Sequence, residues 1–181
     1  MSFLLTCLAT VLVTAATPSA QESKPIKVHV DSFPVMGIFT VTTNERESSP
    51  EALIPRMWAR LRTEDILGRI PNRLDNEIIA VYCDYENGRK GSYKYVLGAR
   101  VSPTKFVPRG MVIQTVEGGT YARYNAEGAP PPVVELWKQI WSDEKPGGLE
   151  RAYHTDYEVH PAGLAENASR SRIDIYIELA K

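Results

Sequence analysis

Apolar side chains recur along this chain with two spacings, one typical of strands and one typical of helices. Residues 27–43 alternate between apolar and polar positions and are rich in β-branched side chains, which predicts a strand. Pro34 and Gly37 within it indicate a bend or a bulge. From residue 53 the apolar positions instead recur every three or four residues, as along one face of a helix. This predicted helical face consists of Leu53, Ile54, Met57, Trp58 and Leu61.

Two signals compete for the start of this first helix. Ser48 and Glu51 have the spacing of a capping box, and Pro50 suits a first helical position, so together they predict an early start. Pro55 lies within the apolar face itself, where it either kinks the helix or marks its true start. The sequence leaves both starts open.

The order helix, strand, strand occurs twice, each time after a further strand. In the first half, residues 77–84 and 91–101 have strand patterns and are joined across residues 86–90, which predicts a hairpin. In the second half, the leading strand is interrupted by a pair of glycines, and the helix follows three prolines. The segments of the second half are a strand at 111–125, a helix at 133–141, and strands at 155–160 and 172–179.

The repeated order indicates an internal duplication. Trp58 and Trp137 occupy matching places in the two predicted helices. One such unit cannot bury its own apolar face, so two units predict a single domain with halves at 26–102 and 110–181 and a seam between them. Because strands outnumber helices, we expect an α+β fold with two helices packed on an antiparallel sheet. A seam between halves is a common place for a small-molecule pocket.

Length, charge and composition exclude several classes of function. The 181 residues suffice for one domain with a substantial core. The net charge is -1 and 24% of residues are charged, without a basic stripe, so no nucleic-acid partner is expected. His29, His154 and His160 lack the spacing of metal ligands, and no nucleophile motif is present. We therefore expect neither a metal nor another cofactor.

The N-terminus has the features of an export signal. The first twenty residues contain no acidic or basic side chain, and an apolar run within them is followed by small residues ending at Ala20. We expect a signal peptide over residues 1–20 that is cleaved after Ala20, then a short linker at 21–25 and a periplasmic or secreted domain at 26–181. The run is too short to span a membrane comfortably, so no stable membrane insertion is expected after cleavage. Because no basic residue precedes the run, an uncleaved anchor is the alternative.

Six short segments, in this order, carry a resemblance to a known family. They are Ile54–Trp58, Ala80–Glu86, Gly118–Ala122, Val134–Trp141, Asp156–Val159 and Asp174–Ile177. On these segments the chain resembles the GyrI-like, AraC-type effector-binding domain. That domain also forms the drug-sensing half of multidrug transcription regulators and occurs as stand-alone integron-cassette proteins. Each segment alone is a weak signal, but together they span nearly all of the predicted domain.

The resemblance implies a fold, a ligand class and one central residue. The fold would be a duplicated β-α-β-β architecture with a central groove, and the ligands would be hydrophobic, often cationic, drug-like molecules. A buried glutamate at the centre of the groove falls on Glu158. Three features depart from the family pattern: no helix-turn-helix segment is recognisable, an export signal is predicted, and His160 replaces a common aromatic residue. Related SOUL domains share the architecture and bind haem, but neither His154 nor His160 is a compelling axial ligand.

Strand alternation gives an independent view of Glu158. In the strand that carries it, Tyr157 and Val159 share one face and Glu158 lies on the other. In the last strand, isoleucines alternate with Asp174 and Tyr176. If the apolar faces of the two strands pack together, Glu158, Asp174 and Tyr176 share the opposite surface. Alternation alone favours a solvated surface, whereas the resemblance favours a pocket role for Glu158.

A buried carboxylate surrounded by aromatic rings suits a bulky cation. Ring faces attract positive charge and remove apolar ligand surface from water. We expect Glu158 to supply charge complementarity, with Tyr82 and Trp137 as the preferred walls. The further candidate ligand-binding residues are Trp58, Trp141, Tyr93, Tyr121, Tyr176 and Asp174. For each aromatic residue taken singly, packing of a helix on the sheet is the alternative role.

The leading hypothesis is an exported, non-catalytic binder of small hydrophobic, cationic molecules, either drug-like compounds or metabolites. Two alternatives stay open. Some GyrI-like proteins hydrolyse reactive, cyclopropane-bearing compounds, in which case Glu158 would be a general base. Other proteins use the fold to bind protein partners. The sequence also leaves open whether the chain forms a homodimer and whether residues 161–171 close over the pocket.

Overall fold

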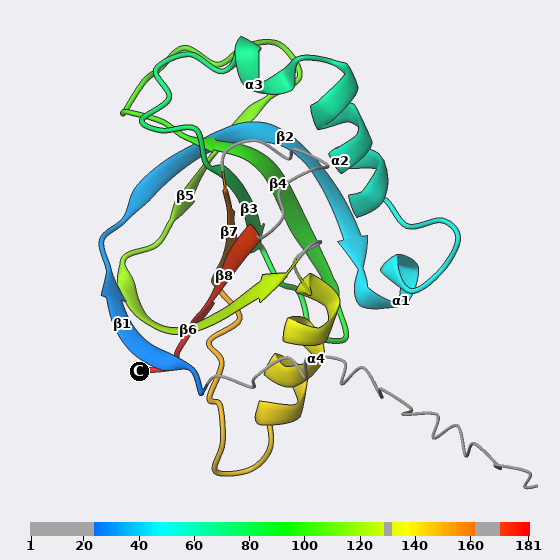
Figure 1. Ribbon diagram of the computed structural model, residues 1–181, viewed down its shortest axis with the longest axis vertical. Helices are drawn as coiled ribbons and strands as arrows, with labels where there is room; N and C mark the ends of the chain where they lie inside the picture. Colours follow the sequence, from blue (N-terminus) through cyan, green and yellow to red (C-terminus); the bar gives the residue numbers. More distant parts are fainter. Residues whose placement is uncertain (1–23, 129–131, 162–170) are drawn as a thin grey trace, which may run out of the picture.

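The computed structural model describes residues 24–128, 132–161 and 171–181 as one eight-stranded antiparallel sheet with four helices (Figure 1). The strands are β1 (Ile26–Val30), β2 (Phe33–Thr43), β3 (Ile78–Cys83), β4 (Ser92–Arg100), β5 (Val112–Val116), β6 (Gly119–Gly128), β7 (Thr155–His160) and β8 (Ser171–Glu178). The helices are α1 (Asn44–Glu47), α2 (Ile54–Thr63), α3 (Ile66–Arg69) and α4 (Val133–Asp143). None of these helices is long and apolar enough to cross a membrane. The predicted signal peptide and the interior of segment 161–171 lie outside the described residues.

The strand order confirms the duplicated α+β architecture. The order is β1-β6-β8-β7-β3-β4-β2-β5, so the two halves meet where β3 pairs with β7. The strands predicted at 27–43 and 111–125 are each divided in two, giving β1 with β2 and β5 with β6. β1 pairs with β6 of the other half, and β5 pairs with β2. Each half therefore gives its first strand to its partner, and the curled sheet has one continuous set of hydrogen bonds.

Two glycines let β2 and β4 approach closely at Gly37, where the sequence predicted a bend or a bulge. Gly37 of β2 and Gly98 of β4 are paired directly across the ladder. A Cβ atom on Gly37 would lie 2.1 Å from the carbonyl oxygen of Leu97, and one on Gly98 would lie 1.9 Å from that of Met36. Both distances are far inside van der Waals contact, so any side chain at either position would push the two strands apart.

The first long helix, α2, begins at Ile54, with Pro55 in its first turn, rather than at the predicted capping box. The Glu47 carboxylate accepts hydrogen bonds from the backbone N–H groups of Leu53 and Ile54, at 3.0 and 3.1 Å. These donors have no partner inside the helix, so Glu47 caps it. The capping box was wrong because the Ser48 hydroxyl instead donates to the carbonyl of Asn44, at 2.8 Å. The short helix α1 ends at Glu47, immediately before Ser48.

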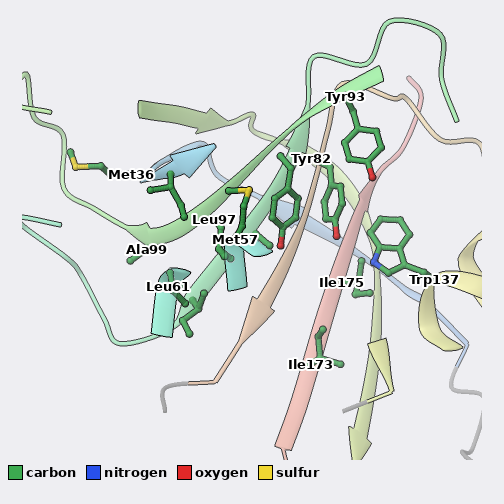
Figure 2. Close-up of a cluster of buried hydrophobic side chains, with 14 of the residues drawn as sticks. Met36, Met57, Leu61, Tyr82, Tyr93, Leu97, Ala99, Trp137, Ile173 and Ile175 are labelled. Carbon is green, nitrogen blue, oxygen red and sulfur yellow. The ribbon is translucent and has the colours of Figure 1, made fainter. Parts of the chain in front are cut away.

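Buried side chains cover both faces of the sheet. On one face, α2 and α4 pack over the strands through residues such as Met57, Leu61 and Ile140. Figure 2 shows part of this cluster, with Tyr82 and Tyr93 of the sheet beside Trp137 of α4. On the other face, the curled sheet encloses a second cluster of Val35, Ile79, Val81, Cys83, Val96, Val116, Tyr121 and Tyr157. Because both faces are buried, apolar residues occur at even and odd positions of the central strands.

Candidate ligand-binding site

A cavity of about 460 Å³ opens where α1, the start of α2, α4 and the seam of the sheet meet. Five of its lining residues are aromatic. From the helices and their flanks it is lined by Asn44, Glu47, Ser48, Ile54, Pro55, Val134, Trp137, Lys138 and Trp141, and from the sheet and its loops by Tyr82, Tyr85, Arg89, Tyr93 and Arg151. The position agrees with the expectation of a pocket near the seam between the halves.

Helical and strand periodicity explain why the rings converge. Trp137 and Trp141 are four residues apart on α4 and therefore lie on one face of it, with ring centroids 6.1 Å apart. Tyr82 and Tyr93 come from the adjacent strands β3 and β4 and are 5.7 Å apart. Tyr82 also meets Trp137 edge-on at 5.0 Å, which joins the helix wall to the sheet floor.

Glu158 lies directly behind this floor rather than in the cavity lining. Its carboxylate is 2% exposed and accepts hydrogen bonds from Tyr82 Oη at 2.7 Å and Trp137 Nε1 at 2.6 Å. The other oxygen is 2.7 Å from Nε2 of His160. Burial by itself raises the pKa of Glu158. The hydrogen bond and the charge of His160, together with the hydrogen bonds from Trp137 and Tyr82, lower it by more. The pKa therefore lies below its usual value, and the carboxylate is ionised at neutral pH.

The register of β7 and β8 corrects one prediction. Glu158 is opposite Ile175, and Tyr157 is opposite Tyr176. The apolar face of the last strand therefore packs on the same side as Glu158, not on the side of Tyr157. Tyr176 instead stacks on Tyr157 at 4.4 Å on the far face of the sheet, where Asp174 also projects. Glu158, Asp174 and Tyr176 do not share a surface.

The remaining candidate residues divide between the two faces. Trp58 lies on the Glu158 side, where its ring meets His160 at 4.6 Å and its Nε1 donates to Tyr95 Oη at 3.0 Å, but it does not line the cavity. Tyr121 belongs to the buried cluster of the far face, and its hydroxyl donates to a backbone carbonyl. The structure thus gathers four of the predicted aromatic residues around the cavity. Those four are Tyr82, Tyr93, Trp137 and Trp141. Ligand contact by any of them stays a prediction.

A buried ion-pair network beside the cavity was not predicted from the sequence. Arg151 donates to Asp156 at 2.7 Å and to Glu144 at 3.1 Å, and the hydroxyl of Tyr85 donates to Asp156 at 2.8 Å. Burial lowers the pKa of Arg151, but the charge of Asp156 and the other partners raise it by more. The pKa is therefore raised, and the side chain stays charged. Asp156 could have been identified because it shares a strand face with Glu158. Arg151 could not, because it lies in an irregular loop without a pattern.

Comparison with known proteins identifies the family. Residues 28–178 match the model described as "Cass2: Integron-associated effector binding protein". The chain belongs to this Cass2 family. The match covers most of the sequence and both halves of the duplicated sheet, so the resemblance to stand-alone GyrI-like effector-binding domains is confirmed. Binding of a small effector is accordingly the general function of this Cass2 protein.

Similar proteins agree with this assignment. The Cass2 chain is 26% identical over 156 residues to "Putative transcriptional regulator protein YobU" of Bacillus subtilis (strain 168), covering 84% of this chain and 96% of YobU. The integron cassette protein VCH_CASS2 of Vibrio cholerae has a TM-score of 0.67 and 22% identity, with 88% and 97% of the two chains covered. SAV2435, solved bound to tetraphenylphosphonium, has a TM-score of 0.66 and 13% identity, with 87% and 94% covered. At these identities the solved structures show the fold alone.

Proposed function

We propose that this protein binds one small, hydrophobic, positively charged molecule in the ring-walled cavity and releases it unchanged. One observation carries the proposal: Glu158 is held directly behind Tyr82 and Trp137, two rings of a cavity of about 460 Å³. Family membership supports effector binding in general. The tetraphenylphosphonium bound to SAV2435 supports a hydrophobic cation as the ligand class.

The free energies of the separate interactions indicate which of them give affinity and which give selectivity for charge. Burying about 200 Å² of apolar ligand surface contributes about 5 kcal/mol. Each cation–ring contact adds about 0.5–2 kcal/mol. A carboxylate roughly one ring away contributes on the order of 2 kcal/mol at an effective dielectric constant of about 20. Ring burial therefore supplies most of the affinity, while Glu158 and the ring faces select for positive charge.

The surroundings of Glu158 support binding without catalysis. A general base has to approach the proton that it removes, directly or through one water. The Glu158 oxygens are already engaged by Tyr82, Trp137 and His160, and the rings lie between this carboxylate and the cavity. A hydrolytic step would first have to break these charge-assisted hydrogen bonds. Recovery of intact ligand after prolonged incubation, checked by mass spectrometry, is the expected result.

The direct test is a titration with tetraphenylphosphonium by calorimetry and thermal shift. A ligand at 100 times its Kd stabilises the protein by about 2.7 kcal/mol. Glu158→Gln keeps an acceptor for Tyr82 and Trp137 but removes the charge, so we expect at least a tenfold loss of affinity. Tyr82→Phe is the matched control, because it removes one hydrogen bond and keeps the carboxylate and the ring. Equal affinity of wild type and Glu158→Gln would remove the acid from the mechanism.

Export is the second part of the proposal, and it is supported by the apolar, uncharged pattern of residues 1–20. Expressed in a bacterial host with a C-terminal tag, the protein should be recovered from the periplasm or the medium with Gln21 as its first residue. Recovery of the full chain from the membrane fraction would favour the anchor, and recovery of the full chain from the cytoplasm would contradict export.

A further inference from the structure

The lining of the cavity carries more positive than negative charge. Three basic side chains, Arg89, Lys138 and Arg151, face one acidic side chain, Glu47. A ligand that carries only positive charge gains no attraction from this excess of positive charge and would be repelled by it. The charges therefore have to be separated into those already paired within the protein and those available to a ligand.

Two of the four charges are committed to the fold. Glu47 accepts hydrogen bonds from two backbone N–H groups at the start of α2, at 3.0 and 3.1 Å. Arg151 forms ion pairs with Asp156 and Glu144, at 2.7 and 3.1 Å, and its side chain is only 3% exposed. Neither group can turn toward a ligand without leaving a buried partner unpaired, which is costly.

The two other charges are available. Lys138 follows Trp137 on α4, is exposed, and forms no hydrogen bond or ion pair with any part of the chain that the structure describes. Arg89 lies over the ring of Trp141 at 5.4 Å and forms one long ion pair with Glu144, at 4.0 Å. Both cations thus stand beside the tryptophan wall of the cavity. Lys138 is unpaired among the described residues, and Arg89 has a half-exposed side chain and only this one long ion pair, so both can contact a bound molecule.

We propose that the ligand carries a negatively charged substituent, such as a carboxylate or sulfonate, in addition to its hydrophobic cationic body. The inference rests on the proposed function, because the body has to occupy the ring-walled cavity. The arrangement of charges then matches a zwitterion. The negative charge of Glu158 lies behind the aromatic floor of the cavity, and the positive charges of Lys138 and Arg89 lie at the edge of the cavity. The positive part of the ligand faces Glu158, and the acidic group lies beside Lys138.

Two dyes with the same aromatic cation test this inference. Rhodamine 110 has a free carboxylate, and rhodamine 123 is its methyl ester, so the pair differs by one negative charge. Exposed ion pairs contribute roughly a two- to fivefold effect each and are screened by salt. We expect rhodamine 110 to bind several-fold more tightly by fluorescence anisotropy in low salt. In high salt the difference should shrink.

Matched variants assign the preference to its side chain. Lys138→Gln should lower the affinity for rhodamine 110 by about two- to fivefold and leave that for rhodamine 123 unchanged or slightly improved. Lys105→Gln changes the net charge equally at an exposed position that does not line the cavity, and it should change neither affinity. Because Lys138 has no partner in the described residues, its substitution should leave the melting temperature unaltered.

Two outcomes separate this inference from the proposed function. If both dyes bind equally and Lys138→Gln weakens both alike, the ligand needs no acidic group, while binding of hydrophobic cations stands. If neither rhodamine nor tetraphenylphosphonium binds, the proposed function fails, and the inference fails with it.

Discussion

The Glu158 carboxylate accepts hydrogen bonds from Tyr82 and Trp137, two rings that line the cavity, and it is 2% exposed. Hydrogen bonds to a charged group contribute about 1.5–3 kcal/mol each, so rotating either ring away from the cavity floor is unfavourable. At the other carboxylate oxygen, away from the cavity, His160 contacts Glu158 and is itself covered by the ring of Trp58. One buried residue thus fixes the orientation of the floor before a ligand arrives, which lowers the entropy lost on binding.

The pH dependence of stability should reveal the same carboxylate. Its pKa in the folded protein lies below the ordinary value of 4.5, since the donors outweigh the effect of burial. The contribution of Glu158 to stability is therefore fully present above about pH 4.5 and is lost as the pH falls through the lower, folded-state pKa. We expect Glu158→Gln to be less stable than wild type at pH 7, with the difference shrinking toward pH 3. Urea denaturation from pH 7 to pH 3 measures this difference. A difference that stays constant over this range would contradict the prediction, since the other acids are common to both proteins.

At the scale of single elements, α2 depends on a residue outside it. Its first backbone N–H groups are satisfied by Glu47, which belongs to α1 and also lines the cavity. α1 and the start of α2 are therefore linked at the edge of the cavity. Since no side chain of α2 itself caps its N-terminus, the link to α1 is what secures this end of the helix.

Removing this cap should destabilise the protein measurably. Loss of a helix cap costs about 0.5–2 kcal/mol, and here two backbone donors lose their partner at once. We expect Glu47→Ala to lower the free energy of unfolding by about 1–2 kcal/mol. Glu45→Ala, two residues before Glu47 and exposed, is the control and should change it by less than about 0.5 kcal/mol. Denaturant titration of both variants checks the prediction, and equal effects would show that Glu47 does not act as a cap.

The elements also show where sequence patterns stop being informative. The hairpin of β3 and β4 and the positions of both long helices follow from periodicity and turn residues. The register of β7 against β8 does not. A strand pattern with period two shows which residues share a face, but it identifies the core only when one face is solvated. Here both faces are buried, so Tyr157 and Ile175 can each lie in a core on opposite sides of the sheet.

For the molecule as a whole, the duplication explains where the cavity lies and which of its residues sequence analysis missed. Tyr82 and Tyr93 come from the first half, and Trp137 and Trp141 come from the second. Sequence analysis named all four as candidate walls because aromatic rings suit a hydrophobic cation, whereas the family resemblance pointed to Glu158. The network of Arg151 with Asp156 and Tyr85 was missed because it joins an irregular loop to both halves. Such contacts arise only when the seam forms, and no local spacing encodes them.

The exchange of first strands predicts that neither half folds alone. β1 pairs with β6, and β5 pairs with β2, so a cut in the loop at 103–110 leaves each fragment with an edge strand whose partner is in the other fragment. Each fragment would also expose the seam between β3 and β7 and one side of the cavity. We expect the separate fragments 24–104 and 105–181 to lack the near-ultraviolet circular dichroism of packed aromatic rings. Mixed in equal amounts, they should regain it together with thermal stabilisation by tetraphenylphosphonium. A single fragment that folds cooperatively by itself would show that the strand exchange does not bind the halves into one folding unit.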